Sequence, residues 1–236
     1  MNMTMRARLQ WLELMLALIG LTGCAVPVSR DGGSGLSYLA LGDSYTIGEG
    51  VAAGERWPLQ LANALRSEHI PLADPRIIAT TGWTTDELDA AIDSAQPLGQ
   101  YDFVSLLIGV NNQYRGRPLD NYRHEFTVLL GRAIGFAGGR ADRVLVLSIP
   151  DWGVTRFGRT SGRDTAQIAR ELDAYNAAAR AICDARGVAF VDITAVSRQH
   201  GAEAAMLVAD GLHPSSSMYA LWTQAALSVA RRLLAQ

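Results

Sequence analysis

The stretch Tyr38-Leu39-Ala40-Leu41-Gly42-Asp43-Ser44-Tyr45 decides the fold of this chain. Its first four residues predict a short buried strand, and Gly42 ends the hydrophobic run. Ser44 follows closely, so its hydroxyl lies at the carboxyl end of the strand, where open α/β sheets bind their ligands. Glycine, aspartate and serine are also common turn residues, so this stretch alone does not separate a nucleophile from an ordinary turn.

Length and composition point to one globular domain. The chain has 236 residues, of which 49% are hydrophobic, enough for a substantial core. The formal net charge is −2, and no basic block interleaved with aromatic residues suggests binding to nucleic acid. Cys24 and Cys183 lie in different contexts, so we expect no disulfide framework. Cys183 has apolar helical neighbours, and we interpret it as a small core side chain.

The N-terminal segment predicts export and a lipid anchor. Residues 1–23 have the pattern of a signal peptide, with two arginines before an apolar run that is too short to span a bilayer comfortably. Leu21-Thr22-Gly23-Cys24 resembles the bacterial lipobox, which implies cleavage before Cys24 and attachment of lipid to its thiol. The alternative is an ordinary signal peptide with an incidental cysteine.

The resulting domain organisation has three parts. Residues 1–23 form the signal peptide, the glycine- and serine-rich residues 24–36 form a flexible tether, and residues 37–236 form the domain. We therefore expect a protein anchored through Cys24 to a membrane surface of the cell envelope, on the periplasmic side.

Hydrophobic runs alternate with helical patterns along the domain. Strands are predicted at 38–41, 76–79, 103–108, 144–149 and 188–193. The last four runs are continuously apolar, which is typical of a parallel sheet covered on both faces. Helices between them supply right-handed crossovers. The predicted architecture is a three-layer α/β/α sandwich with about five parallel strands.

Helices are expected from Trp57, Thr84, Pro118, about residue 164, and after Ser215. Thr84 is followed three residues later by Glu87, the spacing of a capping box. Residues 156–163 are predicted to be a polar loop. The last helix is predicted to bury one face, made of Met218, Leu221, Trp222, Ala225, Val229 and Leu233.

Polar or glycine residues follow three successive strands, at Ser44, Gly82 and Asn111. In a doubly wound sheet the carboxyl ends of these strands lie at one edge. The segment from Asp210 to His213 reaches the same edge if the last helix packs on the sheet. A serine attacks a carbonyl only when a base accepts its proton, and His213 is the candidate base.

The same residues include the remaining parts for acyl transfer. Asp210 lies three residues before His213, so in a tight turn its carboxylate can bind the other ring nitrogen. The backbone N–H groups of Ser44 and Gly82 and the side-chain amide of Asn111 are candidate oxyanion donors. The remaining histidines lack this context, and we interpret them as surface or packing residues: His69, His124 and His200.

Together, four blocks resemble those of the SGNH hydrolases, also called the GDSL esterase/lipase family: Gly42-Asp43-Ser44, Gly82, Gly109-x-Asn111 and Asp210-x-x-His213. The resemblance runs from about residue 38 to the C-terminus. It implies a flavodoxin-like sandwich, a Ser44–His213–Asp210 triad, the oxyanion donors named above, and no metal or cofactor. Asn112 stands where many members carry aspartate, at a position without a catalytic role in the family.

The resemblance implies hydrolysis of carboxylic esters through an acyl-enzyme. Its members act on varied substrates, so short acyl or acetyl esters, a lysolipid and an acetylated envelope polysaccharide all stay open. Acyl transfer on the same triad and a catalytically idle envelope binding protein stay open as alternatives. Asp151 and Arg156 are candidates to meet a polar group of the substrate, and the candidate aromatic walls of the pocket are Tyr45, Trp83, Tyr114, Trp152 and Phe157. For each of these residues, ordinary loop structure is the favoured alternative.

Overall fold

A computed structural model describes residues 35–235 of the chain. The predicted signal peptide, the cleavage before Cys24 and all but the last two residues of the predicted tether lie outside these residues. Leu36, at the predicted end of the tether, is held to the domain by hydrogen bonds of 2.7 Å to the Pro71 carbonyl and 2.8 Å from the Ala73 N–H. Within this range, no helix combines the length and the apolar character that crossing a membrane requires.

The central sheet has five parallel strands in the order β2-β1-β3-β4-β5, which is the flavodoxin-like order. The register pairs Gly42 with both Ala79 and Leu107, so β1, β2 and β3 end level with one another. The predicted sheet is therefore confirmed. Its strands are β1 (Tyr38–Gly42), β2 (Arg76–Ala79), β3 (Phe103–Leu107), β4 (Val144–Leu147) and β5 (Ala189–Val191).

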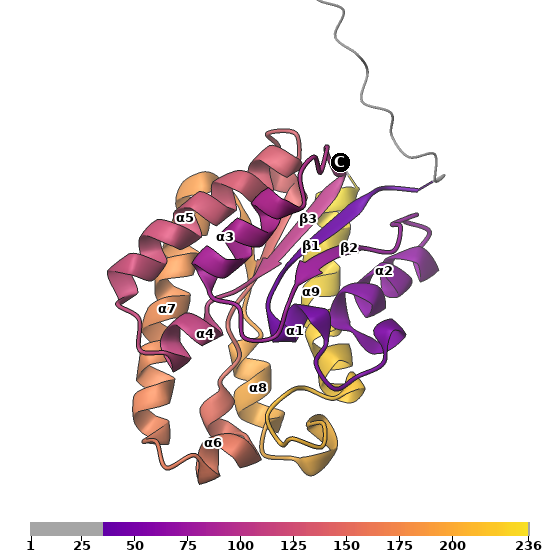
Figure 1. Cartoon of the computed structure of the whole chain (residues 1–236). Coiled ribbons are helices and arrows are strands. Elements are labelled where there is room, and N and C mark those ends of the chain that lie inside the picture. Colours follow the sequence, from indigo (N-terminus) through magenta and orange to yellow (C-terminus); the bar gives the residue numbers. More distant parts are fainter. Residues whose placement is uncertain (1–34, 236) are drawn as a thin grey trace, which may run out of the picture. The chain divides into compact units, whose positions relative to one another are not determined.

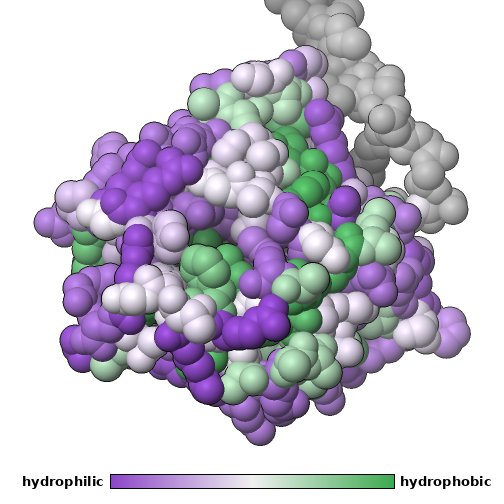
Figure 2. Space-filling model, turned by 60° about the horizontal axis from the view of Figure 1, so that its bottom comes forward, coloured by the Kyte–Doolittle hydropathy of each residue, from purple (hydrophilic) through white to green (hydrophobic). Residues whose placement is uncertain are grey.

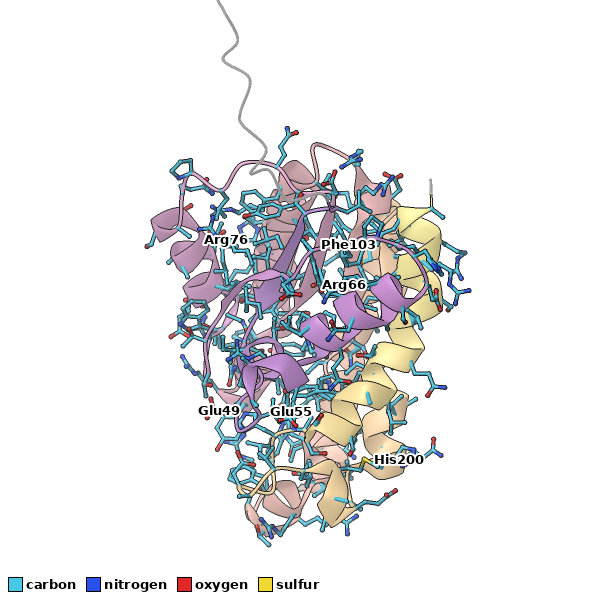
Figure 3. The ribbon with its side chains drawn as sticks, turned by 90° about the vertical axis from the view of Figure 1, so that its right-hand side faces the viewer. Glu49, Glu55, Arg66, Arg76, Phe103 and His200 are labelled. Carbon is cyan, nitrogen blue, oxygen red and sulfur yellow. The ribbon has the colours of Figure 1, made fainter. Side chains whose placement is uncertain are left out.

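Two layers of helices cover the sheet (Figure 1). One face carries α3 (Thr85–Ser94), α5 (Leu119–Phe136) and α7 (Thr165–Arg186), and the other carries α2 (Trp57–Ser67) and α9 (Ser216–Leu234). Figure 3 looks at the second layer, where α2 lies against α9, with Glu49 and Glu55 on the segment that leads into α2. The predicted three-layer sandwich is confirmed.

The buried face of α9 differs from the predicted one. Of the six residues predicted to point inward, only Met218 and Trp222 are buried. Because α9 packs on α2 as well as near the sheet, its buried face is rotated relative to the predicted one, and Ala225, Val229 and Leu233 are only partly buried. The buried face continues through Tyr219, Thr223, Ala226, Ala230 and Leu234.

Short helices occupy several segments in which the sequence analysis predicts no helix. They are α1 (Ser44–Ile47), α4 (Val110–Tyr114), α6 (Arg156–Thr160) and α8 (Thr194–His200). In Figure 1, α1, α4 and α6 lie below the carboxyl edge of the sheet. The prediction of a loop throughout 156–163 is wrong, because Thr155 caps α6 by accepting a 3.0 Å hydrogen bond from the N–H of Gly158.

Candidate active site

Ser44 lies at the carboxyl end of β1, as the first residue of α1. The chain turns tightly here, because a Cβ atom on Gly42 would lie 2.2 Å from the hydroxyl oxygen of Thr46. Asp43 precedes the helix, and its Oδ1 accepts a 3.0 Å hydrogen bond from the N–H of Tyr45. Packing and capping together fix the turn that carries Ser44.

His213 and Asp210 lie in one turn before α9. The Nδ1 atom of His213 is 2.6 Å from Asp210 Oδ2, and Asp210 Oδ1 accepts hydrogen bonds from the N–H groups of Leu212 and His213 at 2.8 and 3.0 Å. Burial alone would raise the pKa of Asp210, but the hydrogen bonds from the His213 ring and the two amides outweigh it and lower the pKa. The ionised carboxylate therefore holds the His213 ring by Nδ1 and leaves the second ring nitrogen, Nε2, available to accept a proton.

Backbone and side-chain contacts fix the geometry of Gly82 and Asn111. Gly82 has a φ of 88°, a conformation that favours glycine. Its carbonyl oxygen accepts a 2.7 Å hydrogen bond from Arg115. The sequence did not predict this contact, because no motif or regular spacing connects the two residues. Asn111 donates from Nδ2 to the carbonyl oxygen of Trp83 at 2.9 Å. The amide nitrogen carries a second hydrogen, which leaves Asn111 a further donor.

One pocket of about 220 Å³ brings the predicted residues together. Ser44, Gly82, Asn111 and His213 all line it, and Asp210 binds the His213 ring. In the part of the chain that the structure describes, no hydrogen bond joins the Ser44 hydroxyl to the His213 ring. Such bonds are often long in ligand-free enzymes and shorten when the substrate binds.

The rest of the pocket wall is mostly apolar. Figure 2 turns this edge of the sheet toward the viewer and shows hydrophobic residues near the centre of the face, with hydrophilic residues around them. Trp83 was predicted to be a wall, but it acts through its backbone carbonyl on Asn111 instead. The other four aromatic residues predicted for the wall do line the pocket. Besides Ser44, Gly82, Asn111 and His213, the residues that line the pocket are Tyr45, Thr81, Val110, Tyr114, Trp152, Phe157 and Leu212.

Comparison with known proteins identifies the family. The sequence matches the model of the GDSL-like lipase/acylhydrolase family over residues 40–221. The chain belongs to this family. The resemblance to SGNH hydrolases is thereby confirmed, and the protein is a serine hydrolase that acts on esters. A search of curated proteins finds no match for this GDSL-family hydrolase.

Solved structures share its fold at low identity. TesA has 17% identity and a TM-score of 0.66, over 84% of this chain and 99% of that one. The psychrotrophic esterase EstA from Pseudoalteromonas sp. has 16% identity and a TM-score of 0.62, over 85% and 100%. The acetylxylan esterase Axe2 from Geobacillus stearothermophilus has 20% identity and a TM-score of 0.64, over 84% and 95%. The GDSL-family hydrolase therefore has the α/β/α fold of these proteins.

Asp151 of the GDSL-family hydrolase has a structural role and is not placed to meet a polar group of a substrate. It is 2% exposed, and its Oδ2 lies 2.9 Å from Nε of Arg198 while its Oδ1 accepts from the N–H of Gly153. The Asp151–Arg198 ion pair ties the segment after β4 to α8. Arg156 is exposed, but it donates a 2.7 Å hydrogen bond to the carbonyl of Ala209 beside the His213 turn.

Two residues next to Asn111 have structural roles in the GDSL-family hydrolase. Asn112 is fully buried and accepts a 3.0 Å hydrogen bond from the N–H of Thr85, which joins α4 to α3. Gln113 accepts from the indole N–H of Trp152 at 2.8 Å and donates to Glu171 at 2.7 Å. The sequence did not reveal that Gln113 holds Trp152 in the pocket wall, because the three residues lie far apart in the chain.

Asp43 is a buried carboxyl group beside Ser44. It is 1% exposed, and within residues 35–235 its Oδ2 has no hydrogen-bond partner. Burial raises the pKa of Asp43 to about 7, although the hydrogen bond from Tyr45 lowers it. The GDSL-family hydrolase therefore has a carboxyl group that titrates near neutral pH in the turn after β1.

This carboxyl group is expected to make the protein less stable as the pH rises from about 4 to about 7. The pKa of Asp43 in the folded state exceeds the ordinary value of 3.8, so across this window the folded state binds more protons than the unfolded state. In Asp43→Asn the side-chain oxygen still accepts from Tyr45, but the charge is gone. The Tm of the variant minus that of the wild type should therefore grow over this window and level off above it, as measured by thermal unfolding.

The matched control is Glu55→Gln, which changes an exposed carboxylate that accepts from the N–H of Ala52 at 3.0 Å. Its Tm difference from the wild type should not follow the trend of Asp43→Asn. A constant Tm difference between Asp43→Asn and the wild type across the window would contradict the raised pKa.

Proposed function

We propose that this protein hydrolyses carboxylic esters of short acyl chains through an acyl-enzyme on Ser44. The observation that carries the proposal is the shared pocket, in which Ser44 and His213 lie with the two remaining candidate oxyanion donors, Gly82 and Asn111. Asp210 supports the role of His213, because it holds Nδ1 and leaves Nε2 to accept a proton.

In the first half of the reaction, Ser44 Oγ attacks the ester carbonyl while His213 Nε2 takes the hydroxyl proton. The negative charge that develops on the carbonyl oxygen is stabilised by the N–H groups of Ser44 and Gly82 and by the amide of Asn111. Each such donor typically contributes about 10²–10³ in rate. The carbon–oxygen bond of the ester then breaks, and the protonated His213 gives its proton to the departing alcohol.

In the second half, water attacks the acyl-enzyme and His213 accepts a proton from that water. A second tetrahedral intermediate uses the same three donors. When it collapses, the bond to Ser44 Oγ breaks and the proton returns from His213 to the serine. The products are the carboxylic acid, the alcohol and the unchanged enzyme.

The size and lining of the pocket support a preference for short acyl chains. Its volume of about 220 Å³ lies below the range of about 300–1,000 Å³ that is typical of pockets for drug-sized ligands. Trp152 is 2% exposed and held by Gln113, so this wall does not yield easily. Phe157 and Leu212 close the pocket on the side of α6 and the His213 turn.

Among 4-nitrophenyl esters, kcat/KM is expected to peak at two to four acyl carbons and to fall by roughly tenfold or more at eight, because a chain too long for the pocket displaces the ester carbonyl from Ser44 and the oxyanion donors. Phe157→Ala should move the peak to longer chains, because it enlarges the pocket. Phe190→Ala is the matched control, since Phe190 is partly buried on β5 and is not among the residues that line the pocket. A wild-type preference for eight carbons or more would contradict the short-chain proposal.

The same assay tests hydrolysis against transfer of the acyl group. When a sugar acceptor is added, hydrolysis predicts that free carboxylic acid remains the main product. Accumulation of acylated sugar would favour a transferase that uses the same triad.

A further inference from the structure

The segment 156–163, Arg-Phe-Gly-Arg-Thr-Ser-Gly-Arg, carries three arginines and no acidic residue. In the described part of the chain none of the three has a carboxylate within 4.0 Å. Arg156 donates to the Ala209 carbonyl, and Arg163 donates to the Tyr114 carbonyl at 2.8 Å and covers that tyrosine ring at 4.1 Å. Other arginines among residues 35–235 do pair with acids, including Arg66, Arg115, Arg117, Arg123, Arg132, Arg140, Arg170, Arg198 and Arg231.

Arg159 has the least engaged side chain of the three. It is exposed, and within residues 35–235 its guanidinium makes no hydrogen bond or ion pair. Guanidinium groups bind phosphate and carboxylate groups through paired hydrogen bonds, so an unpaired one at a pocket wall is suited to an anion.

Arg156 and Arg159 form one wall of a second pocket, of about 470 Å³, which we call the side pocket. The opposite wall is apolar and includes Leu207 and Val208. The residues that line the side pocket come from α6 and from the segment that connects α8 to α9, two parts of the chain that Figure 1 shows at the bottom of the domain. The side pocket therefore offers positive charge on one side and a hydrophobic surface on the other.

The side pocket adjoins the catalytic pocket. The two are separated by the hydrogen bond of 2.9 Å from the N–H of Phe157 to the carbonyl of Gly211. Phe157 lines the catalytic pocket, whereas its neighbour Arg156 lines the side pocket. Likewise, Gly211 lines the side pocket and its neighbour Leu212 lines the catalytic pocket, so consecutive residues of two segments face the two pockets.

Acidic residues near the side pocket are engaged elsewhere. Asp210 follows Ala209 in its wall, but its carboxylate is bound by the His213 ring and by two backbone N–H groups. Glu203 lies between two alanines of the wall, and its carboxylate is 2.8 Å from Nδ1 of His200. Neither carboxylate contacts the guanidinium of Arg156 or Arg159.

We infer that the side pocket binds an anionic group, a phosphate or a carboxylate, carried by the ester substrate. The inference rests on the proposed esterase function and narrows its substrate to esters that bear a negative charge near the ester bond. Arg159 is the principal ligand, because Arg156 is already held by Ala209.

The experiment compares neutral and anionic esters in pairs. One pair places a carboxylate on the acyl side, with 4-nitrophenyl butyrate against mono-4-nitrophenyl succinate. The other pair places a phosphate on the alcohol side, with glycerol monoacetate against its 3-phosphate. The readout is the ratio of kcat/KM for the anionic ester to that for the neutral one, and the pair that shows the preference identifies which side of the ester carries the charge.

The wild type is expected to prefer the anionic ester in at least one pair. Arg159→Ala should lower the ratio about two- to fivefold, as expected for one exposed ion pair, and Arg159→Glu should lower it further. Salt at 1 M, where the Debye length is about 3 Å, should reduce the preference in the wild type.

The matched control is Arg186→Ala, because Arg186 is exposed at the far end of the 22-residue helix α7 and should leave the ratio unchanged. The inference is overturned if neither pair shows a preference, or if Arg159→Glu keeps it. Failure of the wild type to hydrolyse any of the four esters, neutral or anionic, would instead reject the proposed esterase function.

Discussion

Ser44→Ala is expected to lower kcat for 4-nitrophenyl acetate by about 10⁵–10⁶-fold, the loss that follows removal of the nucleophile from a Ser–His–Asp hydrolase. The pocket retains its apolar walls and all three candidate oxyanion donors, because the donor at position 44 is the backbone N–H, so the residual rate above that in water reports what these groups do alone. Labelling of the protein by a fluorophosphonate should disappear together with activity. The measurements are initial rates and mass spectrometry of the labelled chain.

A control separates this loss from a folding defect. Ser67→Ala changes another serine hydroxyl, one on the exposed end of α2 that donates to the Ala64 carbonyl at 2.7 Å. It should keep both activity and labelling. Equal activity in the wild type and Ser44→Ala would reject the mechanism.

His213→Ala is expected to reduce kcat nearly as far as Ser44→Ala, because a serine without a base is a weak nucleophile. The double variant should lose no more than either single variant, since the two residues act as one unit. Asp210→Asn should cost less, about 10⁴-fold. Asparagine keeps the oxygen that accepts from the two backbone N–H groups but turns an N–H donor toward His213 Nδ1, which favours the wrong tautomer.

The chain contains a matched control for this pair. His200 contacts Glu203 through Nδ1 at 2.8 Å, also three residues apart, but neither residue lines the catalytic pocket. His200→Ala should leave kcat unchanged. Additive losses in the Ser44→Ala/His213→Ala variant would contradict a shared proton transfer.

Much of the site could be predicted from the sequence, because each of its residues follows a strand or caps a helix. The Thr84–Glu87 capping box forms as predicted, with a 2.9 Å hydrogen bond from the Thr84 N–H, and it fixes the chain just after Gly82. The turn from Asp210 to His213 is local, so its hydrogen bonds follow from spacing alone. These features need no knowledge of distant contacts.

The features that escaped prediction depend on contacts between distant segments. Which face of α9 is buried depends on how closely α2 approaches it, which periodicity does not specify. Asp151 has the sequence context of an exposed loop residue, yet Arg198 from α8 neutralises it in the interior. Likewise, Arg115 donates to the carbonyl oxygen of Gly82, but the two residues are far apart in the sequence and no motif connects them.

Ser44 and His213 line one pocket but lie near opposite ends of the domain's sequence, and this separation has a consequence for how activity arises during synthesis. The turn that carries Ser44 emerges from the ribosome early, whereas the acid–base turn precedes the last helix, which packs on α2. A nascent chain that ends before Asp210 contains Ser44 and all five strands of the sheet but has no base for the serine. Ester hydrolysis therefore reports that the final helix has docked, and its recovery after denaturation measures completed folding rather than collapse.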